Sequence, residues 1–361
     1  MYTFKCLFNR VIASAGWPAL AICGLIPMAA IGAGAALAQS TTIVVNSSGG
    51  AIDEAYKACF WDDFERETGI KVQSVGNASQ TLAGLKAQVG SGNVEWDLTE
   101  IYDTEFGIAL ANNLLDKLDL GKLPTGSWEK EWYNDYGVWE LPYGTVLVYS
   151  TEKWPNGGPQ PESVTDLWNV EQFPGPRAIQ NNPYDNLEYA MQKAGKAPYP
   201  IDYDTAFAEL DKLKPHVGVY WTTGAQSTQL MQTGQVDMAT MWNGRAFSLL
   251  QQNLPVNIVW KGASLHVSYW SVPKGAPHYD AAMKLLAYMY DPANAEKDAC
   301  FAKKIGYAIP NKRLAEVLDA KTLSALPTSP ENLKVQHPVD AEWWTKNLDE
   351  ATRRWQEWTA K

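Results

Sequence analysis

The sequence predicts an α/β protein of two lobes. Short β-branched segments alternate along the chain with amphipathic segments of helical period. Proline and glycine cluster at residues 155–161 and 173–176, which marks a boundary near the middle of the chain. Residues 141–149 (LPYGTVLVY) predict a strand that contains Gly144 and is suited to a hinge that crosses between lobes. At 361 residues, the chain is long enough for two domains with substantial cores.

The first 38 residues have the pattern of an export signal. Lys5 and Arg10 form a basic start, residues 11–37 are apolar and uncharged, and Ala36-Leu37-Ala38 is a small-residue cleavage motif. A permanent transmembrane helix is disfavoured because prolines and glycines interrupt the apolar run. We therefore expect cleavage after Ala38 and export of a soluble chain to a bacterial periplasm.

The charge balance limits the class of partner. The formal net charge of the whole chain is −10 at pH 7, and the predicted signal carries only basic charges. An acidic exported chain is a poor match for nucleic acid or for an anionic membrane surface. The charge does not identify a ligand.

Two cysteines, Cys59 and Cys300, follow the predicted signal. In an oxidising compartment such a pair could form a disulfide bond. Both could equally be small buried apolar residues, and the sequence leaves the two alternatives open.

The N-terminal part predicts a βαβ unit. Residues 41–45 (TTIVV) predict a strand, residues 46–50 a polar loop, residues 52–68 a helix and residues 70–75 the next strand. A Ser/Gly loop between a strand and a helix can bind anions through its backbone amides, although a plain tight turn explains the same residues. Asn77 is expected to cap the following helix.

Three more segments have the strand-end pattern typical of binding pockets. The strand that begins at Trp96 leads to Tyr102, which opens a helix. In the second lobe, the polar loop 181–186 (NNPYDN) leads into a helix, and residues 221–226 (WTTGAQ) combine a strand end with a helix start.

Residues 236–273 form the stretch around which the chain is organised. It predicts a strand, a turn, a helix and two further strands, at residues 236–241, 242–244, 245–252, 256–260 and 266–272. Ligands of open α/β sheets sit beyond the carboxyl ends of strands, where Trp242, Asn243 and Arg245 are placed. An indole wall, an amide and a planar guanidinium together describe a small-molecule pocket. The alternative is that Trp242 is core packing and Arg245 a solvated helix-start residue.

The sequence offers no catalytic motif. It lacks a Walker-type loop, paired-cysteine or paired-histidine metal spacing, and a Gly-x-Ser-x-Gly motif, and its four histidines are scattered. The sequence therefore does not point to an enzyme. An exported hydrolase or lyase on the same fold remains the remote alternative.

Six segments, in order along the chain, resemble one known family. They are TGIKV, WDL, MWNGRAF, NIVW, YWSVPKG and IGYAIPN. In this order they resemble the bacterial extracellular solute-binding proteins of the spermidine/putrescine-binding type, which are components of ABC importers. The resemblance implies a two-lobed periplasmic-binding-protein fold (type II-like) with crossover hinge strands. It also implies a monomer without a cofactor that delivers a small-molecule ligand to an inner-membrane ABC permease.

On this basis, residues 39–145 and 271–361 are expected to form lobe 1, and residues 146–270 lobe 2.

An alternative role is that of a ligand-sensing partner of a membrane receptor, which would use the same binding chemistry. The residues expected to bind ligand are Ser47, Ser48, Gly49, Asn77, Tyr102, Tyr143, Asp185, Trp221, Gln226, Trp242, Asn243, Arg245, Ser268 and Trp270.

The chain departs from the polyamine-binding pattern at one position. Ser268 stands where polyamine binders of the family have an aspartate for the ligand ammonium, and the loop before the second-lobe helix keeps only Asp185. A hydroxyl cannot compensate a desolvated cation as a carboxylate does. Arg245, in contrast, resembles the arginine of a branch that binds γ-aminobutyrate-like ligands. A carboxylate or amino-acid-like ligand is therefore expected, with a polyamine as the alternative.

Overall fold

The computed structural model describes residues 41–76 and 80–361. The predicted signal peptide, residues 1–38, and the predicted site residue Asn77 lie outside these ranges. Within them, no helix combines the length and the apolar character needed to cross a membrane.

The described strands form one curled sheet with the order β2-β1-β3-β10-β6-β9-β7-β8. Strand β1 pairs in parallel with β2 and β3, and β7 pairs in parallel with β8 and β9. The antiparallel strands β10 and β6 join these two parallel groups. The strands are β1 (Thr42–Ser47), β2 (Lys71–Gly76), β3 (Leu98–Tyr102), β4 (Leu115–Asp116), β5 (Tyr133–Asn134), β6 (Gly137–Ser150), β7 (Arg177–Gln180), β8 (Val217–Trp221), β9 (Met238–Trp242), β10 (Val256–Pro273) and β11 (His337–Pro338).

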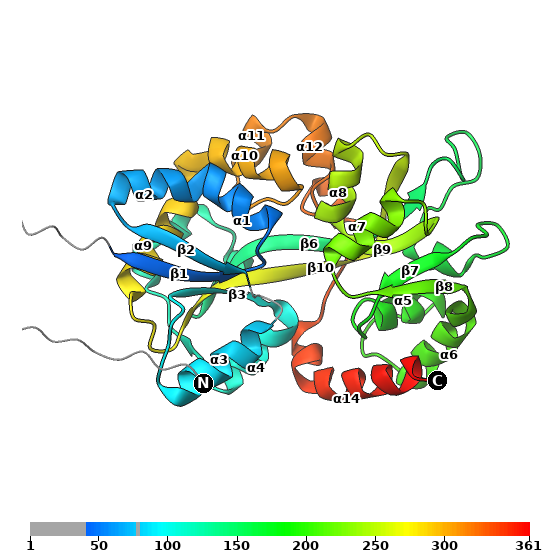
Figure 1. Ribbon diagram of the computed structural model, residues 1–361, viewed down its shortest axis with the longest axis horizontal. Coiled ribbons are helices and arrows are strands. Elements are labelled where there is room, and N and C mark those ends of the chain that lie inside the picture. The colour runs from blue at the N-terminus through cyan, green and yellow to red at the C-terminus, as the bar shows by residue number, and fades with distance from the viewer. Residues whose placement is uncertain (1–40, 77–79) are drawn as a thin grey trace, which may run out of the picture. The chain divides into compact units, whose positions relative to one another are not determined.

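The long strands β6 and β10 lie in the middle of the sheet, between the two parallel groups (Figure 1). The expected strands 256–260 and 266–272 are not separate, because β10 continues through residues 261–265 as one strand. The register of the pairing between β10 and β6 shifts between Val259 and Ser264, and again between Val267 and Tyr269. The pairing resumes after each shift, so β10 remains one strand. Ser264 also pairs with His337 of β11, which supports β10 where the sequence had predicted a break.

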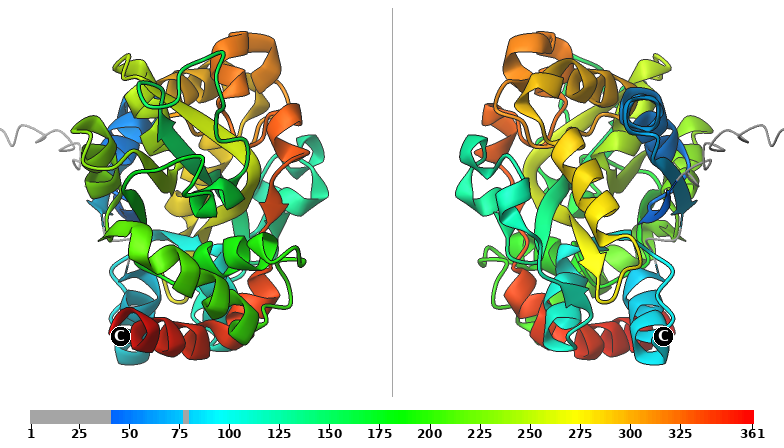
Figure 2. Two further views of the ribbon diagram at one scale, coloured as in Figure 1. Left: turned by 90° about the vertical axis from the view of Figure 1, so that its right-hand side faces the viewer. Right: turned by 90° about the vertical axis from the view of Figure 1, so that its left-hand side faces the viewer.

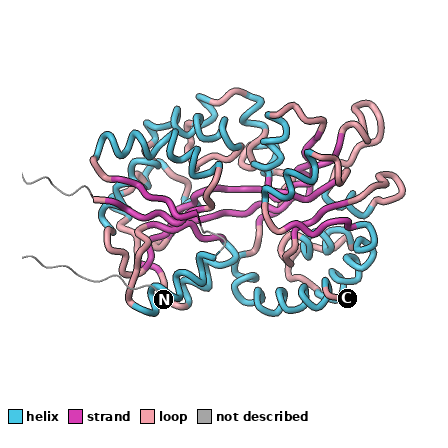
Figure 3. Tube along the Cα trace, in the orientation of Figure 1, coloured by secondary structure: helices cyan, strands magenta, loops and turns pink. Residues whose placement is uncertain are grey.

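Helices cover both faces of the sheet (Figure 3). Helices α10 and α14 lie on opposite sides of it (Figures 1 and 2). The α-helices are α1 (Ala51–Tyr56), α2 (Asp62–Thr68), α3 (Thr81–Ser91), α4 (Asp103–Ala111), α5 (Asn186–Lys193), α6 (Tyr203–Leu213), α7 (Gly224–Gln232), α8 (Asn243–Gln251), α9 (Tyr279–Met289), α10 (Ala295–Ile305), α11 (Leu314–Val317), α12 (Ala320–Ser324), α13 (Pro330–Leu333) and α14 (Ala341–Thr359). The predicted helix 52–68 is continuous, with a π-helical segment, Lys57–Trp61, between α1 and α2.

Two large hydrophobic cores lie along the sheet. The first core takes its buried side chains from residues 43–141 and 270–309, and the second core from residues 146–263 and 344–358. Tryptophans of α14 therefore pack in the second core, although α14 follows the return of the chain to the first. The lobe boundaries at residues 145 and 270 stay a prediction.

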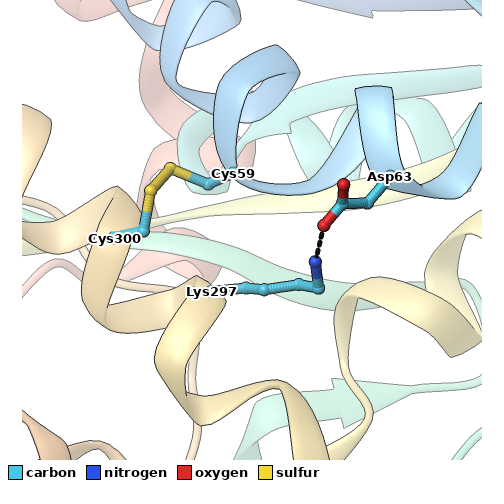
Figure 4. The surroundings of a disulfide bond; sticks show 4 residues. All are labelled: Cys59, Asp63, Lys297 and Cys300. Atoms are coloured by element: carbon cyan, nitrogen blue, oxygen red, sulfur yellow. Dashed lines mark hydrogen bonds and ion pairs between the residues drawn. A yellow bond between two sulfur atoms is a disulfide. The ribbon is translucent and has the colours of Figure 1, made fainter.

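A disulfide bond joins Cys59 to Cys300 across 241 residues of sequence and resolves the alternative left open above. It links the π-helical segment to α10 within the first core, beside an ion pair between Asp63 and Lys297 (Figure 4). Both links tie the N-terminal helices to a helix from the last third of the chain.

Candidate ligand-binding site

A cavity of about 310 Å³ lies at the carboxyl ends of the parallel strands of both groups. Its walls combine residues of the first core's elements, such as Leu141 and Tyr307, with residues of α8 and the β8–α7 turn. This is the position, beyond the carboxyl ends of the strands, at which ligands of open α/β sheets bind. A volume of this size suits a small ligand.

The α8 side of the cavity is formed by Trp242 and Arg245. Trp242 ends β9, and the buried indole of Trp221 packs edge-on against it with ring centroids 5.6 Å apart. The backbone of Gly224 lies close to both lining residues, since a Cβ there would stand 2.7 Å from Arg245 Nε and 3.1 Å from the Trp242 ring. Among the described residues, Arg245 has no ion-pair partner within 4.0 Å. Its guanidinium is therefore available to an anionic group in the cavity.

The β3 side of the cavity carries a buried carboxylate. Glu100 is only 2% exposed, and both of its carboxylate oxygens lie 2.8 Å from the Ser48 hydroxyl, which donates to them. Ser48 Oγ also lies 3.3 Å from the hydroxyl of Tyr102. Burial raises the pKa of Glu100 to about 7, even though the Ser48 hydrogen bond lowers it. This side of the cavity therefore favours a cationic group, which would hold Glu100 ionised.

Tyr307 lines the cavity together with both charged side chains. Burial raises the pKa of Tyr307 to about 12, while Arg245 acts to lower it and Glu100 to raise it. The ring packs directly on Gly244, where a Cβ would overlap it. Asn243 fixes this arrangement, because its Oδ1 accepts from Gly144 N at 2.9 Å and its Nδ2 donates to Gly306 O at 2.8 Å.

In the loop after β1, a side chain of the protein itself takes the place of the anion that a backbone cradle could bind. Gly49 N and the Ser47 hydroxyl both donate to the Asp53 carboxylate, at 3.2 and 2.6 Å. The anion at this helix start is thus a side chain of α1 itself. Only Ser48 of the three predicted loop residues lines the cavity, and it donates to Glu100.

The structure brings six of the predicted site residues together around the cavity. These are Ser48, Tyr102, Tyr143, Trp242, Arg245 and Ser268. Tyr102 and Tyr143 meet edge-on with ring centroids 6.2 Å apart. Ser268 stands opposite Tyr102 in the β3–β10 ladder, and its hydroxyl lies 3.3 Å from both backbone polar atoms of Leu141.

The other described candidates do not line the cavity, for separate reasons. Asp185 is buried against His266 Nε2 at 2.9 Å, and Trp270 is fully buried in the first core. Gln226 accepts a hydrogen bond from Thr222 N at 2.9 Å and thereby caps the β8–α7 turn. Trp221 packs against the cavity residue Trp242, and Asn243 bridges the backbone of Gly144 and Gly306. Ser47 and Gly49 donate to Asp53, which does not line the cavity.

Sequence reasoning missed Glu100 and Tyr307. A signal for Glu100 existed: it is the acidic residue of an otherwise apolar or hydroxylated strand, LTEIY, two positions before Tyr102. Residues two apart in a strand share a face, so a pocket at Tyr102 predicts a pocket at Glu100. For Tyr307 the only signal was its place in the family-like segment IGYAIPN. No cluster of three or more His, Cys, Asp or Glu able to hold a metal ion occurs in the described part of the chain.

Comparison with known proteins assigns the family. The profile of the family described as bacterial extracellular solute-binding protein matches residues 60–330. A gamma-aminobutyric acid-binding protein of Pseudomonas aeruginosa is 32% identical over 338 residues, which is 91% of this chain and 94% of the relative. The spermidine/putrescine-binding periplasmic protein of Escherichia coli is 27% identical over 303 residues, 78% of this chain and 83% of that protein.

A solved structure supports the same assignment. The crystal structure of an ABC transporter substrate-binding protein from Bradyrhizobium japonicum superposes with a TM-score of 0.80 at 32% identity, covering 88% of this chain and 99% of that one. Its fold is the two-lobed α/β fold that the sequence predicts. The chain therefore belongs to the bacterial extracellular solute-binding proteins of ABC transporters.

Proposed function

We propose that this protein captures a small organic ligand bearing a carboxylate, amino-acid-like in character, and delivers it to an inner-membrane ABC permease. The ligand occupies the cavity lined by Trp242 and Arg245. The observation that carries the proposal is the guanidinium of Arg245, which lines the cavity without an ion-pair partner among the described residues. A planar guanidinium binds a carboxylate through two parallel hydrogen bonds. The similarity to a gamma-aminobutyric acid-binding protein supports the same ligand class.

A polyamine fits this cavity less well. It would bring ammonium groups beside the fixed positive charge of Arg245, and like charges at close range repel each other. The serine at position 268 also departs from the aspartate of the polyamine-binding pattern. The similarity to polyamine-binding relatives therefore supports the fold and the transport role more than the ligand.

The location and processing belong to the same proposal. The export pattern of residues 1–38 supports cleavage after Ala38 and a mature protein in the periplasm. There the closure of two lobes, with β6 and β10 as the hinge, would enclose the ligand. The role is binding and delivery, with no chemical conversion of the ligand.

Calorimetry on folded variants tests the proposal, after a thermal-shift screen of carboxylates, amino acids and polyamines has found the ligand. Removing one partner of a buried charge pair costs about 2–5 kcal/mol, or roughly thirty- to several-thousand-fold in affinity. We expect this loss in Arg245→Ala and a large part of it in Arg245→Lys, which keeps the charge but loses the planar fork. Arg66→Ala, a change at an exposed arginine of α2, is the matched control. Affinity within threefold of wild type in Arg245→Ala would exclude the carboxylate clamp.

A further inference from the structure

The cavity contains two opposite charges that do not neutralise each other. Glu100 and Arg245 both line it, yet their charged atoms are not within the 4.0 Å of an ion pair. Tyr307 lines the same cavity. A cavity lined by one carboxylate and one guanidinium is complementary to a molecule with one ammonium and one carboxylate group.

Glu100 also stands near the position that lacks its expected carboxylate. In the ladder between β3 and β10, Tyr102 is opposite Ser268 and Glu100 is opposite Trp270. Directly opposed residues and residues two apart share one face of a sheet. Glu100 therefore lies on the same sheet face as Ser268, one residue pair further along. A carboxylate on the neighbouring strand can take the role that the serine cannot.

We propose that Glu100 binds the ammonium group of the ligand, so that the ligand is a zwitterion held between Glu100 and Arg245. This inference rests on the proposed function, because it assigns the second end of the same ligand. The Ser48 hydroxyl, which donates to both oxygens of Glu100, fixes the carboxylate in position. The neutral walls supplied by Leu141, Tyr143 and Trp242 pack against the hydrocarbon between the two charged ends.

Binding should then be coupled to release of a proton. With the pKa of Glu100 at about 7, a fraction of the free protein carries a protonated Glu100 at neutral pH. An ammonium group favours the ionised carboxylate, so the zwitterion lowers this pKa and expels the proton. A ligand that has the carboxylate but lacks the amine cannot do so.

The test is a cycle of two proteins and two ligands. Wild type and Glu100→Gln are titrated by calorimetry with a series of ω-amino acids and with the matching carboxylic acids that lack the amine. In wild type we expect the amino acid that fits best to bind at least about thirtyfold more tightly than its amine-free analogue. In Glu100→Gln this preference should fall to threefold or less. Glu105→Gln is the matched control, because burial raises the pKa of Glu105 to about 7 as well but Glu105 does not line the cavity.

A second measurement uses the unmodified protein, so the proposal remains testable if Glu100→Gln does not fold. Titrations at pH 7 in buffers of different ionisation enthalpy report the number of protons released. The amino acid should release a fraction of a proton and its amine-free analogue none. Equal affinities for the two ligands, or equal proton release, would overturn the role of Glu100. Loss of binding of both ligands in Arg245→Ala would still support the proposed function, so the two failures are distinguishable.

Discussion

His266 Nε2 lies 2.9 Å from the carboxylate of Asp185, where β10 passes between the two cores. The other ring nitrogen, Nδ1, lies 3.3 Å from Asp103 at the start of α4. All three side chains are buried. Asp103 lies in the segment predicted as part of lobe 1, and Asp185 in the segment predicted as lobe 2. One imidazolium thus connects carboxylates from both sides of the crossover strands.

We predict that His266→Gln destabilises the protein by about 3–5 kcal/mol, because it leaves two buried carboxylates without their cation. Urea denaturation measures the change in the free energy of unfolding. The matched control is His216→Gln, since His216 is exposed. A loss below about 1 kcal/mol in His266→Gln would contradict the buried cation.

The pH dependence follows from the same group. Burial acts to lower the pKa of His266, but Asp185 and Asp103 raise it well above its usual value of about 6.5. Its contribution to stability is therefore complete below pH of about 6.5 and is lost as the pH rises through the higher folded-state pKa. For Asp185, burial raises the pKa, yet His266 lowers it overall, so that contribution is lost only in acid, below its ordinary pKa of about 3.9. The difference in stability between wild type and His266→Gln should shrink as the pH is raised above 7.

The sequence predicted the parts of the fold that depend on local pattern. Strands, helices and the strand-end position of Trp242 and Arg245 follow from periodicity and from the geometry of α/β sheets. The continuity of β10 could not be read in this way, because residues 261–265 contain a glycine and resemble a turn. Ser264 and Leu265 pair with both β6 and β11, and Gly262 N donates to Val335 O, so the strand continues through partners that are distant in sequence.

The site residues were harder to predict because one residue type serves several roles. Asn243 and Trp221 have the chemistry of ligand contacts, but tertiary contacts use Asn243 to bridge two backbone segments and Trp221 to support Trp242. Glu100 is the reverse case, because it lines the cavity but was not predicted as a site residue. A single acidic residue in a strand is ordinarily solvent-exposed, which outweighed the signal from its spacing to Tyr102; in the structure Glu100 is 2% exposed and lines the cavity.

Gly244→Ala should impair both stability and binding. A methyl group at this position would overlap the Tyr307 ring, and overpacking of this kind costs about 1–3 kcal/mol. Displacement of Tyr307 also deforms the cavity wall, so ligand affinity should fall at least about tenfold. Gly90→Ala in α3 is the control, because no atom lies within 4 Å of its Cβ position and alanine favours the helix. Wild-type affinity in Gly244→Ala would show that the Tyr307 wall does not contribute to binding.

The Cys59–Cys300 disulfide should contribute about 2–4 kcal/mol to stability, because it closes a long loop in the unfolded chain. Thermal unfolding of wild type with and without a reductant is compared with that of the double variant Cys59→Ala/Cys300→Ala. Reductant should lower the midpoint of wild type and leave the double variant unchanged. Ligand affinity at a temperature where all forms are folded should be similar, since neither cysteine lines the cavity. An identical wild-type midpoint in both conditions would argue against the bond.

Ser268→Asp restores the carboxylate of the polyamine-binding pattern and should increase affinity for ligands with an amine at that end. A hydrogen bond to a charged group contributes about 1.5–3 kcal/mol, which corresponds to roughly ten- to hundredfold in affinity. The same substitution should lower stability, because Ser268 is 1% exposed and a further carboxylate would be buried beside Glu140. Burial already raises the pKa of Glu140 well above its usual range, and the charge of Glu100 raises it further.

Ser268→Asn matches the aspartate in size without its charge, so it separates the effect of charge from the effect of side-chain size. Calorimetry at pH 8 with an amino acid and a diamine should show the gain in Ser268→Asp only. Equal affinities in the Asp and Asn variants would mean that the amine does not approach this strand.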